Sequence, residues 1–320
     1  MRRGQRRAVL YGAGTLVAAA LLFAGFGITV APDPATRLNG ATLHAEAGQF
    51  DAALDIVALV LREHPGDLDA LIYRATFLGM ARRYDEALRA LADALGAAGE
   101  EPEIARNLQM DRAALLLEMG RTDQFRAARA ELAAAGADHR VLVLDGLEAS
   151  RRGDPAAATA AYARALDAKP DDPAIRARLW NACMEQGKAA VARRRFADAQ
   201  AAFDRARELF PQVAAAHLRA AETRLALADA PGAIEVLRHL SPRTPGIAPL
   251  VFRAATVLLE SGRTVEAIEA LGGAYASDPA AVKSLFETER AWDALRGAAE
   301  VQAVFAEVER NHGGGLTRAH

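Results

Sequence analysis

The chain has few of the residues on which disulfide frameworks and aromatic clusters are built. Among 320 residues there is one cysteine, Cys183, so no intramolecular disulfide can form. Aromatic residues make up 6% of the sequence, and acidic and basic residues nearly cancel to a net charge of −2. A nucleic-acid binder normally carries a basic stripe or domain. The composition therefore excludes a disulfide-stapled fold and argues against nucleic acid as a partner.

Motifs that would carry catalysis, a cofactor or a metal ion are also missing. The seven histidines are dispersed, with no HExxH motif and no cysteine at zinc-ligand spacing. His217 and His239 can approach each other within one repeat, but we expect them to be partly exposed histidines on helix surfaces. The sequence has no G-x-S-x-G nucleophile elbow and no phosphate-binding GxxxxGK-S/T loop. We therefore predict a protein that is not an enzyme and that holds no cofactor and no metal.

The only long hydrophobic run lies near the amino terminus, in residues 8–31, where 24 consecutive residues carry no charge. As a helix this run would measure about 36 Å, which exceeds the bilayer core of about 30 Å. Four arginines precede it: Arg2, Arg3, Arg6 and Arg7. By the positive-inside rule these arginines stay in the cytoplasm. We expect residues 1–33 to form a cytoplasmic stub and a single transmembrane anchor in a bacterial inner membrane, with the rest in the periplasm.

A cleaved signal peptide is the alternative explanation of the same run. Thr29, Val30 and Ala31 offer small residues near a possible cleavage point. However, a signal h-region usually has 7–15 apolar residues, and Pro32 would directly follow the cut. These features favour an uncleaved anchor, and a soluble periplasmic form remains the alternative.

Three prolines recur at a fixed step of 34 residues, at Pro211, Pro245 and Pro279. Alanines keep the same step ahead of them: Ala199, Ala233 and Ala267. A period of about 34 indicates helix-turn-helix units that must stack, because one helix pair buries too little apolar surface alone.

The clearest unit carries a pattern of small and aromatic residues that ends in proline: Gly153, Ala158, Tyr162, Ala165 and Pro170. The next unit repeats it with Phe196, Ala199, Phe203, Ala206 and Pro211. This pattern resembles the tetratricopeptide repeat over residues 34–281, in about seven copies. The resemblance implies an all-α solenoid of antiparallel helix pairs, in which alanine at the crossing points lets the helices approach.

Several places depart from the regular repeat. Phe125 stands where alanine is expected, and extra residues lengthen the loop at 99–103. The step from Ala158 to Ala199 is 41 residues, and the seven extra residues are close to two helical turns. They predict a longer helix from about Pro173 to Arg194. After Pro279 the apolar spacing predicts capping helices over 282–312, followed by a flexible tail at 313–320.

The resemblance also implies a concave groove, lined mainly by the first helix of each repeat, in which protein partners bind. Carried over by register, the predicted groove residues are Ile72, Tyr73, Thr76, Met80, Met110, Asp111, Val143, Leu147, Arg151, Met184, Lys188 and Phe252, with Thr256 one turn after the last. The lysine and asparagine by which chaperone-tail readers of this family hold a carboxylate are mostly replaced by apolar residues. An apolar groove containing methionine suits a helix or an extended segment of a partner.

We predict from these features a non-enzymatic, membrane-anchored scaffold that recruits proteins during envelope complex assembly or secretion. Bacterial proteins of similar architecture serve in protein export, cytochrome maturation, cell-wall synthesis and exopolysaccharide secretion. Two alternatives stay open. In the first, the chain is a noncatalytic subunit of an envelope enzyme or of an exopolysaccharide synthesis or transport complex. In the second, cleavage releases a soluble, chaperone-like periplasmic module.

Overall fold

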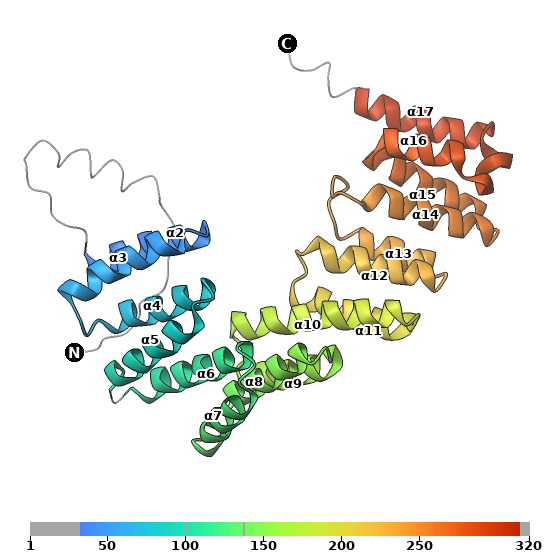
Figure 1. Ribbon diagram of the computed structural model, residues 1–320. Helices are drawn as coiled ribbons and strands as arrows, with labels where there is room; N and C mark the ends of the chain where they lie inside the picture. Colours follow the sequence, from blue (N-terminus) through green and yellow to red (C-terminus); the bar gives the residue numbers. More distant parts are fainter. Residues whose placement is uncertain (1–32, 100, 137, 314–320) are drawn as a thin grey trace, which may run out of the picture. The chain divides into compact units, whose positions relative to one another are not determined.

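A computed structural model describes residues 33–99, 101–136 and 138–313, and every regular element in these ranges is a helix (Figure 1). Its contacts divide the chain into two compact units, residues 1–120 and 121–320. The predicted anchor at 8–31 and the tail after residue 313 lie outside the described residues. Within the described ranges, no helix is long and apolar enough to cross a membrane.

The first unit contains five helices in its described part: α2 (Pro34–Glu46), α3 (Phe50–Glu63), α4 (Leu68–Met80), α5 (Tyr84–Ala97) and α6 (Pro102–Glu118). Helices adjacent in sequence pack together, α2 on α3 and α4 on α5. Two apolar clusters hold these pairs, one spanning α2 to α4 and the other spanning α4 to α6. The core of this unit is therefore a continuous row of inter-helix contacts.

The second unit has eleven α-helices and one 3-10 helix, η1, in its described part: α7 (Thr122–Ala134), α8 (His139–Arg151), α9 (Pro155–Ala168), α10 (Pro173–Ala192), α11 (Phe196–Leu209), α12 (Ala214–Ala226), α13 (Ala230–Leu237), α14 (Ile247–Glu260), α15 (Thr264–Ser277), α16 (Pro279–Thr288), η1 (Arg290–Leu295) and α17 (Ala299–Gly313). The densest packing joins α8 to α9, α10 to α11 and α14 to α15. The same antiparallel pair is thus reused along the unit.

Aspartate followed by proline starts several of these helices. Asp154 precedes Pro155, and its carboxylate accepts a hydrogen bond of 3.0 Å from the Ala157 N–H. Asp278 precedes Pro279 in the same way, with 3.0 Å to the Ala281 N–H. Proline at the first helical position has no N–H to leave unsatisfied, and the aspartate satisfies another free N–H. The local sequence therefore sets where each helix begins.

In six of the helix pairs, a small residue and a large one stand 16 positions apart. Six pairs share this step, all buried: Ala41 and Val57, Ala75 and Leu91, Gly146 and Tyr162, Gly187 and Phe203, Ala221 and Leu237, Ala255 and Leu271. Glycine occurs where the large partner is aromatic, and alanine occurs where it is valine or leucine. A Cβ at Gly146 would overlap the Tyr162 ring, and one at Gly187 would overlap the Phe203 ring. Side-chain volume on one helix is therefore matched to the space on the other.

Helix α10 is the long helix that the 41-residue step predicts, with 20 residues from Pro173 to Ala192. Cys183 lies on its buried face, where burial raises the pKa of the thiol. Phe125 on α7, which replaces the expected alanine, is fully buried. The second unit therefore accommodates both departures from the repeat pattern, the longer α10 and the phenylalanine at position 125.

The carboxyl-terminal end differs in detail from the predicted capping helices. Helix α16 begins at Pro279 instead of residue 282, and α17 continues through Gly313, which the sequence assigned to a tail. Between them η1 buries Trp292 completely. The Tyr275 hydroxyl donates a 2.7 Å hydrogen bond to Glu309 of α17, and this bond raises the pKa of the phenol. The cap therefore packs on the last repeat through aromatic side chains.

The close approach at Gly187 leads to a testable prediction. Gly187→Ala should lower the free energy of unfolding by about 1–2 kcal/mol, because overpacking of Phe203 outweighs the better helix propensity of alanine. Adding Phe203→Leu recreates the alanine–leucine combination of three other pairs and should recover most of the loss. Urea unfolding followed by circular dichroism measures both variants.

The matched control is Gly79→Ala on α4, because a Cβ at Gly79 meets no atom within 4 Å. This variant should be as stable as the parent protein or slightly more so. Equal stability of the Gly79 and Gly187 variants would contradict the volume-matching argument.

Candidate functional site

Four of the predicted groove residues lie on α4 in the first unit, and two of them are engaged in packing. Ile72 is half-buried against the cluster that spans α4 to α6. Tyr73 packs on the other cluster, with its ring 5.5 Å from that of Phe77. Thr76 and Met80 are exposed, and Met80 keeps 49% of its surface accessible. The predicted residues of α4 that are accessible, Thr76 and Met80, thus lie in the last two turns of the helix.

The two predicted residues of α6 differ from each other in exposure. Met110 is half-buried, and Asp111, one position later, is exposed. One residue rotates a helix by about 100°, so neighbours in sequence cannot share one face. Asp111 belongs to the solvent face of α6, and Met110 lies at its border.

In the second unit, three of the predicted groove residues are buried, which corrects their assignment to an exposed groove. Val143 on α8, Met184 on α10 and Phe252 on α14 keep 3%, 6% and 5% of their surface accessible. These three side chains lie on the buried faces of their helices, where neighbouring helices cover them. Leu147 is half-buried, and Arg151 and Lys188 are exposed.

Phe252 and Thr256 are covered by the carboxyl-terminal cap. The Trp292 ring of η1 stacks 6.1 Å from Phe252, and its indole N–H donates a 3.0 Å hydrogen bond to the Thr256 hydroxyl. That hydroxyl in turn donates to the Phe252 carbonyl at 3.1 Å. On α14, therefore, the face predicted to bind a partner is already occupied by the chain's own tryptophan.

A cavity of about 610 Å³ lies where α10 meets the end of α8 and the start of α9. Its walls include the apolar Pro155, Ala158 and Ala182, and its polar side chains come mainly from one face of α10. This volume lies within the range of about 300–1,000 Å³ that is usual for ligand pockets. Of the predicted groove residues, Lys188 is in this cavity.

Charge in this cavity is distributed along α10. The Lys188 ammonium lies 2.8 Å from Glu185, while Arg178 and Asn181 line the same wall. Burial raises the pKa of the Tyr162 phenol, and hydrogen bonding to Ser150 and the charge of Arg178 oppose that rise. The cavity combines apolar walls with donors and acceptors, which suits a polar peptide segment better than a purely apolar helix.

The resemblance did not assign Arg178, Asn181 or Glu185 to the groove. The sequence nevertheless indicates that these residues share one side of α10, because positions 178, 181, 185 and 188 follow the spacing of one helical face. The buried apolar residues Leu179 and Cys183 occupy the opposite face. Helical periodicity within α10 places the solvent side of this helix more accurately than register carried over from other repeats.

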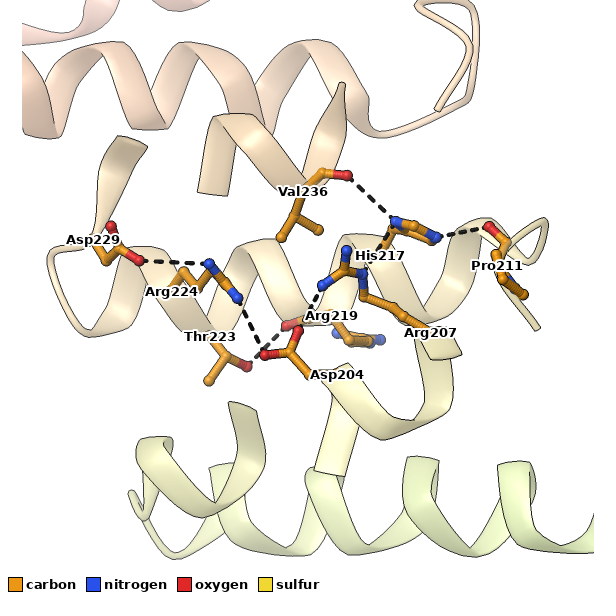
Figure 2. Close-up of polar contacts among 9 residues, drawn as sticks. All are labelled: Asp204, Arg207, Pro211, His217, Arg219, Thr223, Arg224, Asp229 and Val236. Atoms are coloured by element: carbon orange, nitrogen blue, oxygen red, sulfur yellow. Dashed lines mark hydrogen bonds and ion pairs between the residues drawn. The ribbon is translucent and has the colours of Figure 1, made fainter. Parts of the chain in front are cut away.

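A second group of polar side chains joins α11, α12 and α13 (Figure 2). Asp204 accepts a 2.7 Å hydrogen bond from Arg207 and one of 3.1 Å from Arg224. Arg224 also lies 3.8 Å from Asp229, which caps α13 through the Gly232 N–H. The group satisfies its own charges and ties three helices together, so its role is structural.

His217 lies in this group and is buried, contrary to the prediction of a partly exposed surface histidine. Its Nε2 is 2.8 Å from the Pro211 carbonyl oxygen, and its Nδ1 is 3.3 Å from that of Val236 (Figure 2). The ring of His239 lies 6.1 Å away, so the expected approach of the two histidines occurs. In the described part of the chain, no group of three or more histidine, cysteine, aspartate or glutamate side chains is placed to hold a metal ion.

Two segments of the chain match the model of a known protein family. The family model described as tetratricopeptide repeat matches residues 38–102, which span α2 to α5, and residues 184–246, which span the end of α10 to α13. These two segments are similar to the tetratricopeptide repeat. Tetratricopeptide repeats form protein-binding modules that are typically non-catalytic. No curated protein matches the sequence.

Solved structures that are similar to this protein share little sequence with it. The C-terminal part of a repeat protein from Cytophaga hutchinsonii is 15% identical, with 81% of this chain and 99% of that chain covered and a TM-score of 0.47. The type IV pilus biogenesis factor PilW is 17% identical, covering 68% and 98%, with a TM-score of 0.44. Pseudomonas aeruginosa PilF is 16% identical, covering 67% and 92%, with a TM-score of 0.42. At this level the likenesses carry no information about function.

The covering of α14 leads to a prediction about Thr256. Thr256→Val keeps the shape of the side chain but leaves the buried Trp292 indole N–H without its acceptor, so the free energy of unfolding should fall by about 1–3 kcal/mol. Thr76→Val on α4 is the matched control, because the exposed Thr76 hydroxyl donates only to the Ile72 carbonyl. Its effect should stay within about 0.5 kcal/mol. Equal effects in thermal unfolding would contradict a packing role for Thr256.

Proposed function

We propose that this protein is a non-enzymatic scaffold of tetratricopeptide repeats that recruits a protein partner to a bacterial membrane. The observation that carries the proposal is the cavity beside α10, where apolar walls stand next to Arg178, Asn181 and Lys188. Side chains that can donate hydrogen bonds next to apolar surface provide both affinity and orientation for a peptide segment. The family's general use as a protein-binding module supports the same assignment.

The membrane location in this proposal is supported by sequence alone. Residues 8–31 are uncharged and long enough to span a bilayer, and four arginines precede them. Helix α2 begins at Pro34, with only two residues between it and the end of the run. The first repeat would then lie close to the membrane surface, so membrane complexes, or proteins leaving them, are the partners in reach.

If the cavity beside α10 binds one partner, a photoreactive group placed in the cavity should crosslink that partner. A photoreactive amino acid at Asn181, exposed in the cavity, should crosslink one recurrent protein in intact cells. The control position is Asp167, exposed on the opposite side of α9, from which that protein should not be captured. Mass spectrometry identifies the adducts. Capture of many unrelated chains, or equal capture from both positions, would contradict a scaffold with a defined partner.

The anchor assignment predicts that the full-length chain stays with membranes after alkaline carbonate washing. Arginines in place of Leu21 and Leu22 should release it, because each charge at the centre of a membrane helix costs about 2.5–3.5 kcal/mol. Alanines at the same two positions should leave it bound. Protease added to spheroplasts should digest the repeats if they lie in the periplasm.

Intact mass measurement of the chain separates an anchor from a signal peptide. A chain that begins near Pro32 and fractionates as a soluble protein would exclude the anchor and favour the cleaved periplasmic module. A digestion-resistant repeat region in spheroplasts would contradict the proposed orientation.

A further inference from the structure

An apolar groove of about 780 Å³ lies between α13 and α15 in the second unit, with side chains of α14 at its base. It shares no lining residue with the cavity beside α10, and none of the predicted partner-binding residues lines it. The apolar side chains that line it come from three helices: Ile234, Leu237, Ile247, Val251, Leu258 and Ala270. This α13–α15 groove is therefore a separate surface, and its walls are more apolar than those of the cavity.

The groove is open because α13 ends early. Helices α13 and α15 begin one repeat step of 34 residues apart, at Ala230 and Thr264, but α13 has 8 residues and α15 has 14. Pro242 lies where α13 would continue, and the corresponding residue of α15 is Ala276. Proline lacks the backbone N–H that a helix needs and disfavours helical geometry in the residue before it. The chain therefore runs as turns to Gly246, and α13 lacks about 9 Å of helix, or somewhat less than two turns.

The charged side chains that line the groove carry a net negative charge. They are three glutamates, Glu235, Glu266 and Glu269, and one arginine, Arg238. Arg238 pairs with Glu235 at 3.1 Å, and Arg263 donates a 2.8 Å hydrogen bond to Glu266. Within the part of the chain that the structure describes, the exposed Glu269 has no ion-pair partner. A cation on an occupant would therefore meet an unpaired carboxylate on the α15 wall.

The walls of the groove favour a helical occupant over an extended one. All three are helices, whose interior backbone groups are already hydrogen-bonded within the helix. An extended segment would bury its own N–H and C=O groups without partners, whereas a helix satisfies them internally. An amphipathic helix places apolar residues at i, i+3, i+4 and i+7 on one face, which is how helices fill apolar grooves. About two turns of such a helix match the length that α13 lacks.

We propose that the α13–α15 groove binds a basic amphipathic helix of a partner protein. Apolar side chains of this helix lie on Ile247 and Val251, and a lysine or arginine on its flank pairs with Glu269. The site is additional to the cavity beside α10, so the proposal holds or fails independently of what that cavity binds. A scaffold with two sites of different chemistry can hold two partner segments at once.

Two synthetic peptides of opposite charge test the proposal. Both are amphipathic helices of about 15 residues with leucines at i, i+3, i+4 and i+7, flanked by lysines in one peptide and by glutamates in the other. Fluorescence anisotropy measures their binding to the full-length chain in phosphatidylcholine nanodiscs, and empty nanodiscs serve as the blank. The basic peptide should bind about tenfold more tightly than the acidic one, because several weak ionic contacts change sign between them.

Filling the groove should remove this binding. Gly273 lines the α15 wall, and a Cβ added there meets no atom within 4 Å, so Gly273→Trp should fold with its ring in the groove. The matched control is Gly79→Trp on α4, where an added Cβ also meets nothing within 4 Å. Gly273→Trp should lower the affinity for the basic peptide by about tenfold or more, and Gly79→Trp should leave it unchanged. Circular dichroism verifies that both variants are folded.

The ionic contact is tested by Glu269→Lys. This variant should lower the affinity for the basic peptide about two- to fivefold, the usual effect of losing an exposed ion pair, and should raise the affinity for the acidic peptide. Glu131→Lys, at an exposed position on α7, makes the same change in net charge and should alter neither affinity. Equal effects of the two variants would overturn the pairing with Glu269.

Three results would overturn the proposal as a whole. The first is equal affinity for the two peptides, or no binding of the basic one. The second is unchanged binding of the basic peptide to Gly273→Trp, which would place the peptide elsewhere on the chain. The third is self-association of the free protein that Gly273→Trp abolishes, which would show that a second copy occupies the groove. None of these results affects crosslinking from Asn181, which tests the cavity beside α10 separately.

Discussion

Close approach of two helices is the interaction on which the rest of the structure depends. Each unit consists of helix pairs, and each pair can bury its apolar face only if the helices come near enough for one large side chain to reach across. The 16-residue step between a small and a large residue meets this condition in six pairs. Where the large residue is Tyr162 or Phe203, even the methyl group of alanine would overlap the aromatic ring, and the small position is a glycine. In each pair, a larger side chain on one helix is thus matched by a smaller residue on the other, although the residue types differ between pairs.

Because the pairs are so similar, the distinctive surfaces arise where the pattern is broken. The seven extra residues of α10 lengthen one helix, and its solvent face carries the charged and amide side chains of the cavity beside α9. The shortened α13 does the opposite and uncovers the apolar base of the groove beside α15. A regular array offers the same face repeatedly, whereas an insertion or a deletion creates a local site. Both candidate sites in the second unit have this origin.

Polar side chains also join successive repeats. Asp204, Arg207 and Arg224 connect α11 to α12, and the two ring nitrogens of His217 face backbone carbonyls before and after α12. A buried histidine with both nitrogens engaged holds the connecting loop in place. From sequence alone this histidine was assigned to the surface, because a single polar residue on an alanine-rich helix gives no indication of the carbonyls it will meet.

The amino-acid sequence by itself determined the all-α class, the length of α10, and the aspartate–proline starts of helices such as α9 and α16. These features are local, since caps, prolines and helical periodicity act within a few residues. Only the tertiary structure decided which of the predicted groove residues stay open. Val143, Met184 and Phe252 are buried because neighbouring helices, and in one case Trp292, cover them. A displacement of one position rotates a side chain by about 100°, so exposure depends on packing that no short stretch of sequence contains.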